Sequence, residues 1–228
     1  MTKISIHQPM YLPYIGVFNK IKNVDIFVFL DDAMYSDGYY FNRNRIKTQN
    51  GALMLTVPLK KSSDKNLDKI KIENNILWQK KHMRSIILNY EKSDHFKDYR
   101  GFFEEVYNVD TRWEKLHDLN MKTMLYLMDQ LNIDTPFYLA SKLLKNHPPL
   151  GGTKRLVEIC KELDAKIYLS GIGGKDYIEK KLFEKDCIEL EFQNYVSKDY
   201  KQLYGDFISN LSIVDLLFNH GEGTCDFI

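Results

Sequence analysis

Four short polar motifs combine residue types that can bind a ligand or move a proton. The first is the pair His7 and Gln8, which ends an apolar run at residues 4–6 and precedes a loop stiffened by Pro9 and Pro13. Histidine titrates near neutral pH, so His7 is a candidate general base, and the Gln8 amide can both donate and accept hydrogen bonds. The alternative is that both side chains only cap local backbone groups.

Two adjacent carboxylates, Asp31 and Asp32, end a second apolar run at residues 26–30. Such carboxylates bind sugar hydroxyls, act as general bases or hold a divalent cation. Neighbouring side chains in an extended segment point to opposite faces, so only one of the two faces a cleft. Asp32 is the catalytic candidate, and a solvated strand end is the alternative.

The third motif, at residues 40–47, is rich in cations. A strand would place Arg43, Arg45 and Lys47 on one face, with Asn42 and Asn44 on the other. Guanidinium groups bind diphosphates and carboxylates through paired hydrogen bonds, so Arg43, Arg45 and Asn42 are predicted substrate contacts. The alternative is a solvated edge strand protected by charge, although asparagines are poor strand formers.

The fourth motif is a glycine-rich loop that follows a predicted strand and opens a helix. Its candidate binding residues are Ser170, Gly171, Gly173, Gly174 and Lys175. Glycines let backbone N–H groups approach an anion, and Lys175 adds a cation. The spacing matches neither a P-loop nor a dinucleotide-binding fingerprint, and a tight turn is the alternative.

Strands alternate with helices at both ends of the chain, which predicts a mainly parallel, Rossmann-like sheet. The strands that begin at Lys3, Ile26 and Lys166 are expected to be neighbours, because their apolar runs suit buried parallel strands. Ligands of open α/β sheets bind beyond the carboxyl ends of the strands, where His7 and Asp32 lie. Further strands are expected at residues 136–140 and 187–192, with helices at residues 14–21, 153–163, 175–184 and 212–220.

The middle of the chain follows a different pattern. Asn50 and Gly51 predict a tight hairpin turn between strands at residues 40–48 and 52–59, with another strand at residues 69–73. Helices are expected at residues 75–90, 96–107 and 112–131, with Asn75 capping the first and Thr111 capping the third. The fold class is therefore α/β, one domain over residues 1–228 with a hairpin and a helical insertion at about residues 75–131.

Composition limits the classes of partner. The chain has 228 residues, of which 44% are hydrophobic and 28% charged, and its net charge of +1 offers no general attraction for nucleic acid. No apolar run reaches the roughly 20 residues of a membrane span, and the three cysteines favour a reducing compartment. We expect a cytoplasmic protein without an integral membrane segment. The histidines show no metal-ligand spacing, and no cofactor is indicated.

Together these motifs resemble the WbqC-like family. The resemblance is carried by residues 6–16, 25–32, 42–46, 168–177 and 211–221. It implies a role in O-antigen or other surface-polysaccharide biosynthesis, with a nucleotide-activated sugar as the anionic substrate. Tyr11 and Tyr14 join the predicted substrate contacts, and Tyr14 stands where family members often have tryptophan.

Two functions follow from the resemblance. The first is a transferase that modifies a nucleotide-linked amino sugar, with His7 as base and Arg43 and Arg45 as a phosphate clamp. The glycine-rich loop then forms a second anion site. The second is a non-catalytic protein that binds sugar or nucleotide and scaffolds the same pathway. Convergence of His7, Asp32 and Arg43 around one pocket would favour the enzyme.

Overall fold

The computed structural model describes residues 1–228 and combines eight α-helices with two β-sheets. The chain forms two compact units, which are described separately. The first unit contains Met1–Gln8, Asn19–Asp32 and Ile133–Val196. The second contains Pro9–Phe18, Ala33–Asn132 and Ser197–Ile228. The division falls inside helix α1 (Ile15–Lys22), so the chain crosses between the units within that helix.

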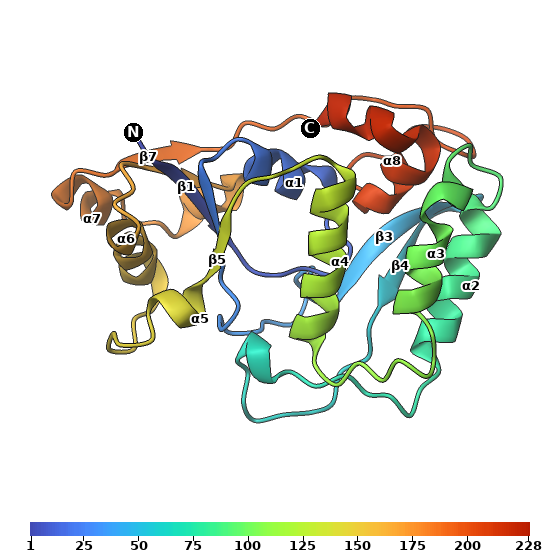
Figure 1. Ribbon diagram of the computed structural model, residues 1–228, viewed down its shortest axis with the longest axis horizontal. Helices are drawn as coiled ribbons and strands as arrows, with labels where there is room; N and C mark the ends of the chain where they lie inside the picture. Colours follow the sequence, from blue (N-terminus) through green and yellow to red (C-terminus); the bar gives the residue numbers. More distant parts are fainter. The chain divides into compact units, whose positions relative to one another are not determined.

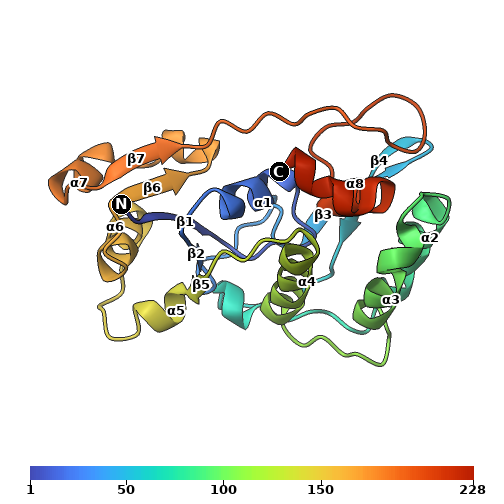
Figure 2. The same ribbon diagram turned by 45° about the horizontal axis from the view of Figure 1, so that its top comes forward.

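The first unit is built on a five-stranded sheet of order β5-β2-β1-β6-β7 (Figures 1 and 2). Every neighbouring pair in it is parallel. The strands are β1 (Lys3–His7), β2 (Ile26–Phe29), β5 (Phe137–Leu139), β6 (Ile167–Ser170) and β7 (Glu189–Phe192). The expected parallel sheet is confirmed, and β1 has β2 and β6 as its two neighbours.

Three helices complete the first unit: α5 (Ala140–Leu143), α6 (Gly152–Glu162) and α7 (Lys180–Lys185). The core is made by apolar side chains of the sheet and of these helices, including Ile4, Val28, Leu156 and Phe183. The rings of Tyr168 on β6 and Phe183 on α7 stack at 5.2 Å. This packing holds the strands in place, so their carboxyl ends can carry polar residues at low cost.

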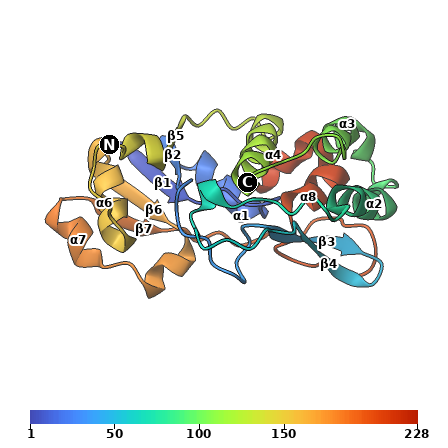
Figure 3. The same cartoon turned by 90° about the horizontal axis from the view of Figure 1, so that it is seen from below.

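The second unit contains an antiparallel hairpin of β3 (Arg43–Thr48) and β4 (Gly51–Thr56), drawn as adjacent arrows in Figure 3. The register pairs Thr48 with Gly51, which confirms the predicted hairpin, with its turn at Gln49 and Asn50, one residue earlier than predicted. Gly51 has a φ of +100°, a backbone conformation that side chains with a Cβ rarely adopt. The hairpin therefore fixes the spacing of the basic residues on β3.

The helices of the second unit are α2 (Trp78–Tyr90), α3 (Phe96–Val106), α4 (Leu116–Gln130) and α8 (Ile213–His220). Helix α4 buries an apolar face, since Leu119, Met124 and Leu127 are all buried. Ser212 caps α8, because its side chain accepts a hydrogen bond from the backbone N–H of Val214. None of the protein's helices has the length and apolar character needed to cross a bilayer.

Three predicted helix starts and one predicted strand are wrong. The helix expected from residue 175 begins only at Lys180, as α7. Helix α2 begins at Trp78 without a cap from Asn75, whose N–H instead donates to Glu73. Residues 69–73 make only isolated bridges rather than a strand. Helix α4 begins at Leu116, since Leu116 N–H donates to the Ile70 carbonyl and Ile72 N–H to the Glu114 carbonyl. These long-range pairings occupy the backbone that a capping box would have used.

Candidate functional site

Strands β1 and β6 part at their carboxyl ends. Their pairing covers only Lys3 with Ile167 and Ile4 with Tyr168, although both strands continue further. Beyond that point the Ser5 hydroxyl donates to the Leu169 carbonyl at 2.6 Å and replaces the missing ladder contact. The sheet order also reverses here, since β2 and β5 lie on one side of β1 while β6 and β7 lie on the other. Doubly wound sheets bind ligands at such a switch point.

His7 and Gln8 lie at this edge, as the sequence predicts. The Nδ1 atom of His7 is 3.0 Å from the Gln8 carbonyl oxygen, which favours the tautomer that leaves Nε2 unprotonated. Burial, together with the positive charge of Lys20, lowers the His7 pKa to about 3. The imidazole is therefore neutral at physiological pH and free to accept a proton, although it is a weak base.

Lys20 is the residue of this edge that the sequence analysis missed. It lies on α1, is 2% exposed, and donates one long hydrogen bond of 3.4 Å to the Ile6 carbonyl. Burial lowers its pKa to about 7. An ammonium group has three donors, so most of the hydrogen-bonding capacity of Lys20 is unused. A lysine on the apolar face of a short helix between two strands is the only sequence signal that could have found it.

The glycine-rich loop follows β6 and forms the short 3₁₀ helix η2 (Ile172–Asp176). The Ser170 hydroxyl donates to the Gly171 carbonyl at 3.1 Å. A Cβ on Gly174 would collide with Ser170 Oγ, so glycine is required there by close packing. Gly173 is exposed, and the Lys175 ammonium lies 5.5 Å from the centre of the Phe192 ring. The start of the loop is packed and its tip is open.

Asp31 and Asp32 both hold structural contacts at the end of β2. Asp31 accepts hydrogen bonds from the backbone N–H and the hydroxyl of Ser141, at 3.0 and 2.6 Å, and so caps helix α5. Asp32 forms an ion pair with Arg155 of helix α6. The catalytic role predicted for Asp32 stays a prediction, and it would require this carboxylate to act while paired.

The basic residues of β3 have separate surroundings. Arg43 lines a pocket, and its Nε atom is buried without a hydrogen-bond partner. The Arg45 guanidinium donates to the Asn210 carbonyl at 3.3 Å, while Lys47 is buried in other contacts. Asn42 supports the hairpin, since its amide donates to the Val57 carbonyl at 2.8 Å. Of the three basic residues in line on β3, only Arg43 therefore lines this pocket.

The pocket at Arg43 has a volume of about 350 Å³, within the usual range for small-molecule sites. Three lysines of the following loop also line it, and these are Lys60, Lys61 and Lys65. Asp37 is the one acidic residue in its wall. The pocket is accordingly basic and suits an anion. Sequence reasoning missed the lysines, because a polar loop gives no periodicity that assigns its side chains to a face.

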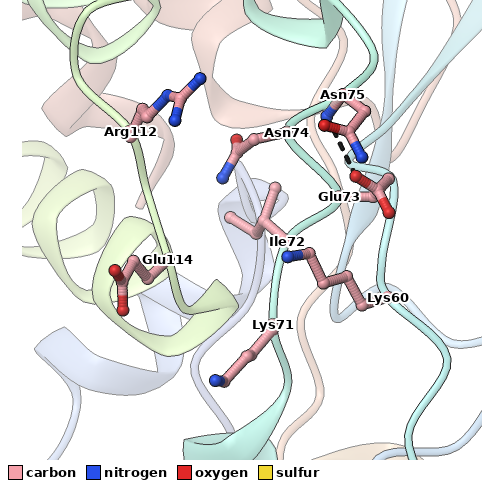
Figure 4. A pocket seen from close by; sticks show the side chains of 8 residues that line it. All are labelled: Lys60, Lys71, Ile72, Glu73, Asn74, Asn75, Arg112 and Glu114. Carbon is pink, nitrogen blue, oxygen red and sulfur yellow. Dashed lines mark hydrogen bonds between the residues drawn. The ribbon is translucent and has the colours of Figure 1, made fainter.

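A second pocket of about 240 Å³ shares Lys60 with the first (Figure 4). Lys71 and Arg112 supply further positive charge, whereas Glu73 and Glu114 supply carboxylates. Figure 4 shows the Lys60 ammonium among these side chains, with Glu73 hydrogen-bonded to the backbone N–H of Asn75 at 3.0 Å. Both signs of charge face this pocket, so it suits a ligand that carries an amine as well as an anion.

The two tyrosines of the first motif are packed inside the second unit. The Tyr11 hydroxyl is 2.8 Å from His82 Nδ1 and 2.5 Å from the Tyr107 hydroxyl, and the side chain is fully buried. Tyr14 is half-buried, and its ring lies so close to Gly16 that a Cβ there would collide with it. Tyr11 has a clear structural role, and its contact with substrate stays a prediction.

One group of side chains has the geometry to hold a divalent ion. The ligand atoms of His147, Glu158 and Glu162 all lie within 4.8 Å of one another. In the structure the two histidine nitrogens face the two carboxylates, at 3.5 and 3.1 Å. These distances are those of a histidine held between two acids. Spacing alone did not reveal the group, because His147 comes from a loop outside helix α6.

These features define a class: α/β proteins with a doubly wound parallel sheet, polar residues at its switch point and a separate basic pocket. The chain belongs to the WbqC-like protein family, whose model matches residues 8–226. It is 31% identical over 239 residues to the uncharacterized protein Rv1507c of Mycobacterium tuberculosis, an alignment that covers 100% of this chain and 98% of that protein. No solved structure matches the chain.

Proposed function

We propose that the protein is a transferase that modifies an amino sugar carried on a nucleotide, in the biosynthesis of O-antigen or another surface polysaccharide. Membership of the WbqC-like family supports the pathway. The substrate class rests on one observation, which is that the basic pocket at Arg43 adjoins a pocket of mixed charge through the shared residue Lys60. A nucleotide-linked amino sugar likewise carries a negatively charged diphosphate next to a sugar that bears an amine.

In this proposal the basic pocket binds the diphosphate. Arg43 supplies a guanidinium with an unpartnered Nε donor, and Lys60, Lys61 and Lys65 add flexible ammonium groups. Charged hydrogen bonds of this kind are stronger than neutral ones, and a guanidinium matches two phosphate oxygens at once. Asn42, also in the pocket wall, helps to position Arg43 through its place at the base of the hairpin.

We assign the chemistry to the carboxyl edge of β1 and β6 in the first unit, as a proposal separate from the two pockets of the second unit. His7 is neutral at working pH, so it can take the proton that an acceptor amine loses as its nitrogen bonds to the transferred group. The bond between that group and its donor breaks in the same step, and the rest of the donor is the leaving group. Gln8 orients the same substrate, and the loop at Ser170, Gly171 and Gly173 holds a second anionic group. Asp32, Arg45, Tyr11, Tyr14, Gly174 and Lys175 complete the proposed set.

A thermal-shift screen of the full chain against nucleotide sugars, free nucleotides and acyl donors tests the proposal. A ligand that binds the folded state raises the unfolding midpoint, because at one hundred times its Kd it adds about 2.7 kcal/mol to the free energy of unfolding. We expect nucleotide amino sugars to raise the midpoint most. Arg43→Ala should reduce the rise, whereas the matched control Arg84→Ala, at an exposed position of α2, should keep it. A rise that is equal in both variants would remove Arg43 from the site.

A non-catalytic protein that binds the same ligand is the second candidate. It is favoured by the ion pair between Asp32 and Arg155 and by the weak basicity of His7, since both reduce the catalytic power of this edge. Turnover separates the two functions. A transferase should lose about 10²–10⁴-fold in rate in His7→Gln while it still binds ligand. A binding protein should show no turnover with any donor in either form.

A further inference from the structure

We propose that Lys20 is an anion-binding residue, and that a phosphate or carboxylate oxygen of the substrate completes its hydrogen bonds at the edge between β1 and β6. The proposed function supplies the identity of the substrate, and the anion site itself rests on the surroundings of Lys20. Those surroundings combine burial, missing partners and a backbone that leaves room beside the amine.

The surroundings of Lys20 lack any compensating charge. The side chain is 2% exposed, it takes part in no ion pair, and its single hydrogen bond of 3.4 Å is long for a charged donor. The neighbouring titratable group is His7, which is itself neutral and lies near enough for the lysine charge to lower its pKa. Burying an amine in this way is costly, so a purely structural role would have supplied an acceptor.

The space next to the amine is bounded by glycine. The Lys20 Nζ atom lies 3.8 Å from the point where a Cβ on Gly171 would stand. Gly171 has no side chain there, so a ligand atom can approach both the amine and the backbone at the start of the loop. This position is also where β1 and β6 part and where the sheet order reverses. An anion bound there would face the ammonium group directly.

The same arrangement couples binding to protonation. Burial holds the Lys20 pKa near 7, so a large share of the molecules carry a neutral amine at physiological pH. An anion beside the amine favours its charged form, and the site then takes up a proton as the ligand binds. The effect depends on the negative charge beside the amine and not on the shape of the anion. Acetate and phosphate therefore serve as probes.

The experiment follows Lys20 by NMR in the full chain labelled with ¹³C at the lysine Cε atoms. The Lys20 signal is identified by its loss in Lys20→Met. It is titrated with pH in chloride, in inorganic phosphate and in acetate at equal ionic strength. We expect phosphate, acetate or both to raise the Lys20 midpoint by at least one pH unit relative to chloride. A shift with phosphate alone identifies a phosphate site, and a shift with acetate identifies a carboxylate site. An identical midpoint in all three salts overturns the proposal.

Protein stability gives a second, independent measurement. Lys20→Met removes the incompletely hydrogen-bonded amine and keeps the volume of the methylene chain. The unfolding midpoint at pH 6 should therefore rise by about 2–4 °C. Lys154→Met makes the same substitution at an exposed position of helix α6 in the same unit and should leave the midpoint unchanged. A fall in the midpoint of Lys20→Met would show a structural role and overturn the proposal. Neither result depends on which nucleotide sugar the protein uses.

Discussion

Lys20 in the first unit and Lys47 in the second are equally buried, each 2% exposed, but their surroundings differ. The Lys47 ammonium donates to the Gln202 side-chain oxygen at 3.0 Å and forms a further short hydrogen bond to the Asp206 carbonyl. The Lys20 ammonium has only the long contact to the Ile6 carbonyl. The fold supplies close hydrogen-bond acceptors for the Lys47 ammonium, but it leaves the Lys20 ammonium with unused donors.

The second unit also contains a buried carboxylate, Asp215, that interacts electrostatically with Lys47. Asp215 is fully buried, and it accepts hydrogen bonds from the Tyr90 and Tyr200 hydroxyls at 2.7 and 2.8 Å. Burial raises the Asp215 pKa, while these hydroxyls and the charge of Lys47 oppose that rise. The comparison teaches that burial alone does not identify a functional lysine. A buried lysine with acceptors stabilises its surroundings, and one without them is a candidate for ligand binding.

The largest expected effect is the loss of the satisfied charge. Lys47→Met should lower the free energy of unfolding by about 3–5 kcal/mol, because it leaves buried acceptors and the Asp215 carboxylate without their cation. Urea unfolding at pH 7 measures the change. Lys71→Met, at an exposed position, is the control and should stay within about 0.5 kcal/mol of the wild type. A loss below about 1 kcal/mol for Lys47→Met would erase the difference between the two buried lysines.

Arg43, a half-buried cation of the second unit, extends the comparison. Arg43→Ala should weaken binding of a nucleoside diphosphate by about 1.5–3 kcal/mol with little change in stability, because its guanidinium lines an open pocket. Arg45→Ala should weaken binding less, since that guanidinium already contacts the Asn210 carbonyl. Titration calorimetry at constant ionic strength measures both. Equal losses in the two variants would restore the linear clamp predicted from sequence.

Removal of the unsatisfied charge should have a smaller effect of opposite sign. The folded-state pKa of Lys20 is about 7, below the unfolded value of 10.5, so the unfolded chain binds more protons between these values. The loss in the free energy of unfolding that Lys20 causes is therefore complete below pH 7 and decreases as the pH rises toward 10.5. Lys20→Met should gain about 1–2 kcal/mol near pH 6 and progressively less at higher pH. Urea unfolding from pH 6 to pH 9.5 measures this, and a pH-independent difference would contradict it.

The smallest expected effect concerns the two units themselves. Both tryptophans, Trp78 and Trp113, belong to the second unit, so their fluorescence reports on that unit alone. A single cooperative domain over residues 1–228 predicts that fluorescence and far-ultraviolet circular dichroism give the same midpoint, within error. Lys20→Met should then shift both signals together. Separate transitions would show that the units unfold independently and would end the single-domain prediction.

Much of the architecture follows from local pattern. The apolar runs at β1, β2 and β6 predict buried parallel strands, and Asn50 with Gly51 predicts the hairpin, because an apolar run and a tight turn are each encoded by neighbouring residues. The placement of His7 at a strand end is recovered for the same reason. The start of α4 is not predicted correctly, because long-range backbone pairing with Ile70 and Ile72 overrides the capping signal.

The α/β class, the strand ends and the polar motifs of the family can all be predicted from the order of the residues. The tertiary fold then sets which of these residues keep free hydrogen-bonding groups. It paired Asp32 with Arg155, used Asp31 to cap a helix, and enclosed Tyr11 in a hydrogen-bond network. It also buried Lys20 with only one long hydrogen bond, to the Ile6 carbonyl. The reason is physical: a side chain's partners and solvation come from segments far apart in the chain, which no local pattern records.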